Sequence, residues 1–208
     1  MPVTISIANS KGGVGKTTTA MGLAAELKRM YPQSDVMLAD MDKQGSATKW
    51  AKMARDAGDP LPFKVSLANI QSVSWLAEEL PNDGFLIIDT APGDSAVMDA
   101  AIRASHFVIV PTGPSGMDMD RMWETLGLLT SHQKMHAVLV TQARLNTNQL
   151  ADALQVLDTT ETSRFNTIIT NLQRYPKEYG TNPARDRAYG DVAVEIVNAL
   201  STQMEAAQ

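Results

Sequence analysis

The chain contains no cysteine, so neither disulfide bonds nor thiolate metal sites can contribute to its structure. No apolar run is long enough to cross a bilayer, and no charged-then-apolar secretory segment opens the sequence. With 44% hydrophobic residues the chain can build a substantial core, and we expect one cytoplasmic domain over 1–208. The net charge of −5 excludes a uniformly basic nucleic-acid binder, but it leaves room for a local basic patch.

A glycine-rich segment at 10–18 lies between a β-type run at 3–8 and a helical pattern at 19–30. Without Cβ atoms, its glycines let the backbone turn several N–H groups toward one anion, and the helix N-terminus adds its dipole. Lys16 supplies a positive charge for phosphate, and Thr17 supplies a hydroxyl for Mg²⁺. The segment predicts a phosphate cradle, with a glycine- and lysine-rich turn that binds nothing as the alternative. The residues expected to contact the nucleotide are Lys11, Gly12, Gly13, Val14, Gly15, Lys16, Thr17 and Thr18.

Three carboxylates follow short apolar runs that are typical of strands buried on both faces of a parallel sheet. Asp40 and Asp42 follow one such run, and Asp89 ends another. Ligands bind at the carboxyl ends of strands in open α/β sheets, and an unpaired buried carboxylate is costly. We therefore expect Mg²⁺ to be held by Thr17, Asp40 and Asp89, directly or through water. A solvated acidic loop is the alternative for 40–50.

Strand-like and helix-like segments alternate along the chain, which predicts an α/β fold with a doubly wound, mostly parallel sheet and helices on both faces. Further helices are expected at 46–56, 71–80, 96–104, 117–130, 148–157 and 191–204. Further strands are expected at 63–67, 107–110, 136–141 and 165–169. The three histidines show no ligand spacing, so the only metal we expect is Mg²⁺.

The segments 10–18, 40–50, 85–93 and 111–118 together resemble the ParA/MinD family of P-loop ATPases. The first is similar to that family's deviant Walker A motif, in which a second lysine, here Lys11, stands at the start of the loop. The fourth has the P-x-x-P-S-x-x-D pattern of small plasmid-partition ATPases of the ParA/ParF type. The resemblance implies ATP and Mg²⁺ as cofactors, and a homodimer that encloses ATP.

The same resemblance implies roles for individual residues. Lys11 would reach the phosphates of the partner subunit, Lys16 would bind phosphate in its own subunit, and Asp42 would position the attacking water. These three are the expected catalytic residues. The positions expected to switch between nucleotide states are Gln44, Ser46 and Gly93.

Basic side chains gather in the C-terminal part of this acidic chain, at Arg164, Arg174, Lys177, Arg185 and Arg187. In the resembled family, basic residues of this region bind DNA nonspecifically through its phosphates, and such binding is steeply salt-dependent. An ordinary solvated face is the alternative. The sequence ends in small, polar or acidic residues instead of a basic amphipathic membrane anchor, so we expect no membrane partner.

The leading hypothesis is a Mg²⁺-dependent ATPase that partitions a plasmid or another replicon. Its ATP-bound dimer would hold nonspecific DNA at the nucleoid, and a small centromere-binding protein of the ParB/ParG type would stimulate hydrolysis. One alternative keeps the ATPase and changes the cargo to a protein assembly. Two others are a nucleotide-switched scaffold with negligible turnover and a metabolic enzyme that resembles dethiobiotin synthetase.

Overall fold

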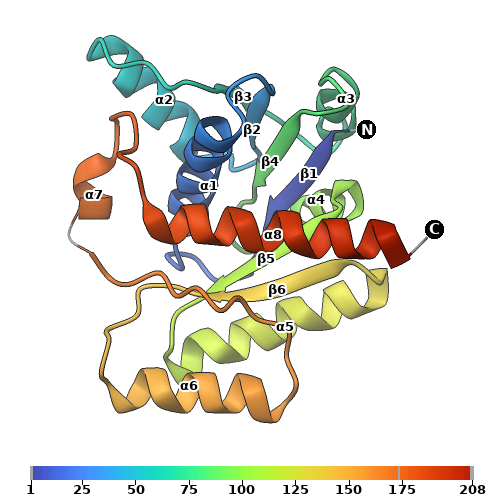
Figure 1. The fold of residues 1–208 in the computed structure, drawn as a ribbon, viewed down its shortest axis with the longest axis vertical. Coiled ribbons are helices and arrows are strands. Elements are labelled where there is room, and N and C mark those ends of the chain that lie inside the picture. Colours follow the sequence, from blue (N-terminus) through green and yellow to red (C-terminus); the bar gives the residue numbers. More distant parts are fainter. Residues whose placement is uncertain (1, 173, 207–208) are drawn as a thin grey trace.

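The computed structural model describes residues 2–172 and 174–206, and a six-stranded parallel sheet lies at its centre. The strand order is β3-β2-β4-β1-β5-β6 (Figure 1). The strands are β1 (Val3–Ile7), β2 (Val36–Asp40), β3 (Lys64–Leu67), β4 (Phe85–Asp89), β5 (Phe107–Thr112) and β6 (Met135–Val140). This arrangement confirms the predicted doubly wound α/β class.

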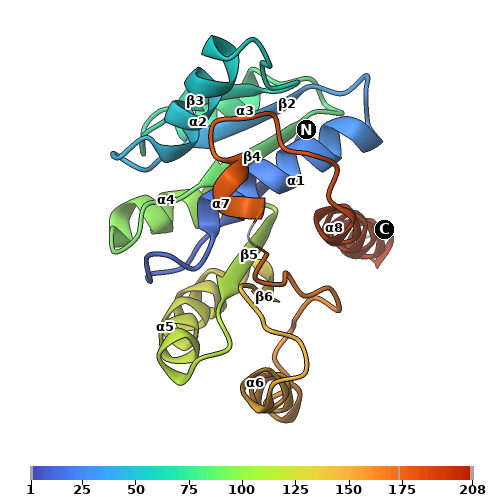
Figure 2. The ribbon, with the colours of Figure 1, turned by 90° about the vertical axis from the view of Figure 1, so that its left-hand side faces the viewer.

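Helices cover both faces of the sheet, with α1 and α8 on one side and α4 and α5 on the other (Figures 1 and 2). The helices are α1 (Lys16–Met30), α2 (Ser46–Asp56), α3 (Val73–Glu78), α4 (Ser95–Ala104), α5 (Gly116–His132), α6 (Asn148–Thr159), α7 (Arg174–Glu178) and α8 (Arg187–Ala206). Among the described residues, no helix combines the length and apolar character that a membrane crossing requires.

Successive residues of the central strands enter different cores. In β4, Ile87 packs in the core beneath α1 and α8, whereas Leu86 and Ile88 pack in the core beneath α3 and α4. All three side chains are fully buried. A strand covered on both faces has no solvent-facing position, which explains why its sequence is a continuous apolar run.

The strand register brings the sequence motifs to one edge of the sheet. Ile7, the last residue of β1, pairs with Asp89, and Asp89 pairs with Asp40 on its other side. The glycine-rich segment 10–18 follows β1 directly. The loop and both carboxylates therefore lie at the carboxyl ends of three neighbouring strands, where an open α/β sheet binds its ligands.

The segment 165–169, predicted as a last strand, runs beside β6 without becoming a regular strand. At its two ends, the N–H groups of Phe165 and Ile169 donate to the backbone oxygens of Val138 and Val140 in β6, at 3.0 and 2.9 Å. In between, the N–H groups of Asn166 and Thr167 donate to the carboxylate of Glu195 at 2.8 and 3.0 Å. A side chain of α8 thus takes hydrogen bonds that a strand partner would otherwise accept, so the prediction of a regular strand is wrong.

The helix boundaries also differ from those predicted. The C-terminal helix begins at Arg187, earlier than the predicted 191, because Asp186 accepts a hydrogen bond from the backbone N–H of Ala188 at 2.9 Å. This is the geometry of an N-cap. The short helix α7 lies in a segment for which the sequence predicted no helix.

Candidate functional site

The segment 10–18, which we call the P-loop, is bent into a concave backbone by glycines in the left-handed region. Gly13 has φ 78°, and Gly15, the N-cap of α1, has φ 84°. A cavity of about 340 Å³ lies over the loop, and we call it the phosphate cavity. Its lining residues are Gly12, Gly13, Gly15, Lys16, Thr17, Thr18, Asp42, Ser46, Thr90, Pro92 and Gln142.

Lys16 is a nearly buried cation at the first position of α1, with 6% of its surface exposed. Its Nζ donates to the backbone oxygen of Lys11 at 2.7 Å. Burial lowers the pKa of Lys16, and the nearby carboxylates of Asp89 and Asp42 oppose that shift. An ammonium has three N–H donors, so the donors not used by Lys11 are available to phosphate oxygens.

Thr17 and Asp89 form the part of the site that fits Mg²⁺. The Thr17 hydroxyl donates to Asp89 Oδ2 at 2.7 Å, and Asp89 is fully buried. The other oxygen, Asp89 Oδ1, has no hydrogen-bond partner within the described part of the chain. Burial raises the pKa of Asp89 to about 7, against the opposing effects of the Thr17 bond and the Lys16 charge. A buried carboxylate oxygen without a donor is what a hard cation or its bound water would satisfy.

No group of three or more acidic or histidine side chains converges on a common point among the described residues. The protein alone therefore cannot surround an ion at this site. Mg²⁺ commonly keeps several waters and binds through one or two carboxylates together with phosphate oxygens of the substrate. Thr17 and Asp89 match that mode of binding.

Asp40 directs its carboxylate into its own loop. Oδ2 accepts from the backbone N–H and the hydroxyl of Thr48, both at 2.8 Å, and Oδ1 accepts from the N–H of Asp42 at 3.2 Å. Asp40 is fully buried, and both of its oxygens have protein donors. A direct bond to the metal would compete with these hydrogen bonds, so the observed contacts give Asp40 the role of fixing Asp42 and the first turn of α2.

Asp42 and Ser46 line the phosphate cavity together with Lys16, as their predicted roles require. Asp42 Oδ1 accepts from the N–H of Gln44 at 2.8 Å, which holds the turn before α2. The side chain of Gln44 is exposed and does not line the cavity. Of these positions, Asp42 and Ser46 are the ones that the structure brings to the P-loop.

Gly93, the third predicted switch position, contacts the P-loop through its backbone. It has φ 70°, and its N–H donates to the backbone oxygen of Ser10 at 3.1 Å. This N–H would have to leave Ser10 before it could bind a phosphate oxygen. The structure shows one acceptor for this N–H, the Ser10 oxygen, and Gly93 does not line the phosphate cavity, so its switch role stays a prediction.

Lys11 is paired within its own chain. Its ammonium forms an ion pair with Asp118, the last residue of the predicted 111–118 motif. Burial alone would raise the pKa of Asp118, but the Lys11 ammonium and the Ser115 hydroxyl outweigh it and lower that pKa. A Cβ at Gly113 would lie 2.5 Å from Asp118 Oδ2, so the glycine gives the carboxylate its room. The 111–118 loop therefore lies beside the P-loop, and the pair must open before Lys11 can reach a partner subunit.

Two residues after β6 support the P-loop, although the sequence pattern did not single them out for this. The Thr141 hydroxyl donates to the backbone oxygen of Val14 at 2.9 Å, and Gln142 Nε2 donates to the backbone oxygen of Gly13. Gln142 has φ 53°, which is uncommon for a residue other than glycine. No local pattern could reveal these contacts, because they join positions more than 100 residues apart.

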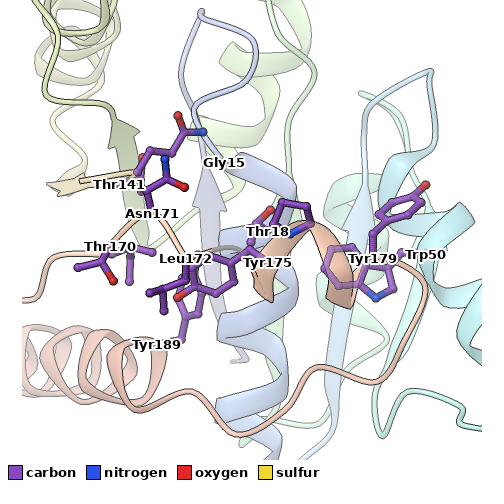
Figure 3. Close-up of a pocket in the computed structure, with 13 residues that line it drawn as sticks. Gly15, Thr18, Trp50, Thr141, Thr170, Asn171, Leu172, Tyr175, Tyr179 and Tyr189 are labelled. Atoms are coloured by element: carbon purple, nitrogen blue, oxygen red, sulfur yellow. The ribbon is translucent and has the colours of Figure 1, made fainter. Parts of the chain in front are cut away.

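A second cavity, of about 600 Å³, adjoins the phosphate cavity, and we call it the side cavity (Figure 3). The two cavities share Gly15, Thr18 and Gln142. Because a nucleotide joins its base to its phosphates through the sugar, the side cavity is where the base and sugar would lie. Its remaining lining residues are Trp50, Thr141, Ile169, Thr170, Asn171, Leu172, Tyr175, Pro176, Tyr179 and Tyr189.

The five basic residues predicted to bind DNA do not form one free patch. Arg164 pairs with Asp158 at 2.7 Å, and Arg174 pairs with the buried Asp186 at 2.6 Å. Arg187 is almost fully exposed and lies 3.8 Å from Asp191. In the described part of the chain, Lys177 and Arg185 have no acidic group within 4.0 Å. Arg164 and Arg174 thus serve internal ion pairs, which the charge count along the sequence could not distinguish from a DNA surface.

Comparison with known proteins identifies the family. The family described as CobQ/CobB/MinD/ParA nucleotide binding domain matches residues 5–178. The chain belongs to this family. The ParA/MinD resemblance and the ATPase class are thereby confirmed, and ATP and Mg²⁺ are the cofactors that the family and the cavity chemistry support together.

Several proteins resemble this ParA/MinD-family ATPase over most of its length. It is 34% identical over 157 residues to Maintenance of carboxysome distribution protein A of Gloeobacter kilaueensis, with 74% of this chain and 68% of that protein covered. It is 29% identical over 170 residues to Chromosome-partitioning ATPase Soj of Thermus thermophilus, with 68% and 66% covered. A plasmid partition protein from Borrelia burgdorferi superimposes with TM-score 0.70 at 19% identity, over 95% of this chain and 99% of that one. At that identity the last likeness establishes the fold.

Proposed function

We propose that this ATPase distributes a large cargo through an ATP-bound homodimer, and that the cargo is a plasmid or another replicon. The observation that carries the proposal is a second lysine, Lys11, at the start of a P-loop that already holds the buried cation Lys16. One lysine suffices to bind phosphate within a subunit. A second one, bound only to a partly exposed carboxylate, is free to act across an interface once ATP offers it a stronger acceptor.

Five residues in and around the phosphate cavity have a part in this proposal. Lys16 donates to the phosphates, and Thr17 and Asp89 hold Mg²⁺, which offsets the negative charge of the phosphate oxygens when it is bound. Asp42 lies on the wall of the cavity, where its carboxylate can accept a hydrogen bond from the attacking water and orient it. Asp40 keeps Asp42 in place through the loop that both belong to.

Opening of the Lys11–Asp118 pair is the step that links ATP to dimerisation. The Lys11 side chain is 31% exposed and that of Asp118 is 19% exposed, so solvent weakens the pair. Partly exposed pairs of this kind contribute about 1 kcal/mol or less. The charge of a triphosphate at the interface can offset that loss, and hydrolysis would return Lys11 to Asp118 and separate the subunits.

A protein assembly is the second candidate for the cargo, and the identity to one relative favours it. The relative named for carboxysome distribution is 34% identical to this chain, compared with 29% for the relative named for chromosome partitioning. The two cargoes predict different stimulating partners. Hydrolysis stimulated by a small DNA-binding protein together with its own DNA site supports the replicon, whereas stimulation by a DNA-free adaptor supports the assembly.

Nonspecific DNA binding by the ATP-bound dimer is also part of the proposal, and it rests on fewer residues than the sequence suggested. Lys177 and Arg185 are exposed and lack an acidic partner in the described structure, so they are the best phosphate contacts among the five basic candidates. Replacing both with glutamine should weaken binding to DNA of any sequence and reduce its salt dependence. Unchanged binding would remove this surface from the proposal.

Lys16→Ala tests the nucleotide site itself. Loss of a buried cation from the P-loop should abolish measurable ATP binding and phosphate release, because no other cation lines the phosphate cavity among the described residues. Lys64→Ala is the matched control, since Lys64 is an exposed lysine of β3 that does not line this cavity. Hydrolysis by Lys16→Ala at the rate of the control would show that the site is misassigned.

A further inference from the structure

Asp186 is a buried carboxylate that lies outside the phosphate cavity and contacts two hydrogen-bond donors and one cation. Only 6% of its surface is exposed. Oδ2 accepts from the Tyr175 hydroxyl at 2.8 Å and forms an ion pair with the Arg174 guanidinium at 2.6 Å, and Oδ1 accepts from the N–H of Ala188 at 2.9 Å. A carboxylate with this many partners, one of them charged, is held in a single orientation.

A second buried carboxylate, Glu26 of α1, holds the backbone at Asp186. Glu26 is 4% exposed, and its Oε1 accepts from the N–H of Asp186 at 2.6 Å and from Arg29 at 2.7 Å. Because α1 begins at Lys16, one helix carries both the phosphate-binding cation and the anchor of Asp186. The contacts run from the phosphate cavity along α1 to Asp186 and from there to Tyr175.

Tyr175 brings this network to the wall of the side cavity (Figure 3). Its ring meets Tyr189 edge-on, with the ring centroids 6.0 Å apart, and the Arg174 guanidinium carbon lies 5.2 Å from the Tyr175 centroid. Burial raises the pKa of Tyr175 to about 12, so its hydroxyl remains a donor to Asp186 at neutral pH. The orientation of the ring is therefore set by Asp186 and Arg174 together.

We propose that Asp186 is a positioning residue that holds the Tyr175 ring as a contact surface for the base of the bound nucleotide. This inference rests on the proposed function, in which the phosphates lie on the P-loop and the base enters the adjoining side cavity. It also gives Arg174 a role, since its guanidinium forms an ion pair with the Asp186 carboxylate, whose backbone N–H is held by Glu26. Aromatic contact with a base contributes to affinity whatever the phosphate chemistry.

Two conservative variants test the proposal, and two probes separate the base from the phosphates. Tyr175→Phe removes only the hydroxyl, and Asp186→Asn keeps the size of the side chain and an acceptable N-cap. The probes are ATP and inorganic tripolyphosphate, which lacks the base, each with Mg²⁺. We expect the dissociation constant for ATP to rise about three- to tenfold in both variants, from the loss of one or two hydrogen bonds that orient the ring.

Affinity for tripolyphosphate should stay unchanged in both variants, because tripolyphosphate has no base to contact the Tyr175 ring. Asp191→Asn is the matched control, because it makes the same change at an exposed position of the same helix. Unchanged ATP affinity in Tyr175→Phe, or an equal loss of affinity for both probes, would overturn the inference. If Asp186→Asn does not fold, Tyr175→Phe alone decides the matter. A separate result would overturn the proposed function: Lys16→Ala would then bind ATP and tripolyphosphate as tightly as the unaltered protein does.

Discussion

Replacing Gly22 with alanine should destabilise the protein, although alanine is the better helix former. Gly22 lies in α1, and a Cβ at this position would come 2.3 Å from Cδ2 and 2.7 Å from Cε2 of Tyr189. Tyr189 is 2% exposed and packs in the core between α1 and α8, so its ring cannot move into solvent. The added methyl group must push α8 away from α1 or shift the ring, which also lines the side cavity.

The size of the effect follows from two opposing contributions. A glycine-to-alanine change inside a helix stabilises by roughly 0.5–1 kcal/mol, whereas overpacking a core costs about 1–3 kcal/mol. An approach of 2.3 Å to a buried ring is well inside van der Waals contact, so the overpacking cost lies at the upper end. We expect a net loss of about 2 kcal/mol, which corresponds to a fall of roughly 4–8 °C in the unfolding temperature of a chain this long.

Gly127→Ala is the control for this prediction. Gly127 lies in α5, is exposed, and has no heavy atom within 4 Å of the position where its Cβ would be. The same chemical change should there stabilise the protein by roughly 0.5–1 kcal/mol. Urea unfolding of both variants, followed by circular dichroism, measures the difference. Equal stability of the two variants, or a more stable Gly22→Ala, would refute the packing of α8 on α1 described above.

Two further predictions concern the carboxylates of Asp42, which lines the phosphate cavity, and Asp89, which binds Thr17 of that cavity. Asp42→Ala should still bind ATP while phosphate release falls about 100-fold, and an equal loss of ATP binding would contradict its role in orienting water. In metal-free protein Asp89→Asn should be stabilising, and increasingly so as pH rises, because the pKa of about 7 in the folded state exceeds the roughly 3.9 of an unfolded aspartate. Ionisation of the buried Asp89 carboxylate therefore lowers the free energy of unfolding of the wild-type protein as the pH rises from about 4 to about 7. Urea unfolding in EDTA should show the advantage of Asp89→Asn growing by about 2–3 kcal/mol between pH 5 and pH 8, whereas a shrinking advantage would contradict the assigned environment.

The phosphate side of the site could be predicted because its signals are local. The glycines and Lys16 follow one strand, and Asp42 and Asp89 follow two others, so a parallel sheet brings them together whatever the intervening chain does. The buried strands could be predicted from their apolar runs, which are also a local signal. Each of these features depends on residues a few positions apart.

The side cavity could not be predicted, because it is built from contacts between distant residues. Nothing near Tyr175 in the sequence indicates that Asp186 and Glu26 fix it, or that Trp50 of α2 donates a hydrogen bond to the backbone oxygen of Thr181. The charge of Arg174 suggested DNA, but its partner is a buried carboxylate that only the fold reveals. Long-range pairs of this kind leave no periodic pattern.

Sedimentation of the protein with Mg²⁺ and either ATP or ADP tests the central claim most directly. In the Asp42→Ala background, which keeps ATP intact, we predict a dimer with ATP and a monomer with ADP. Adding Lys11→Ala should leave ATP bound and return the protein to the monomer. A monomer in ATP without the Lys11 change, or a dimer that persists when Lys11 is replaced, would contradict an ATP-joined dimer held by Lys11.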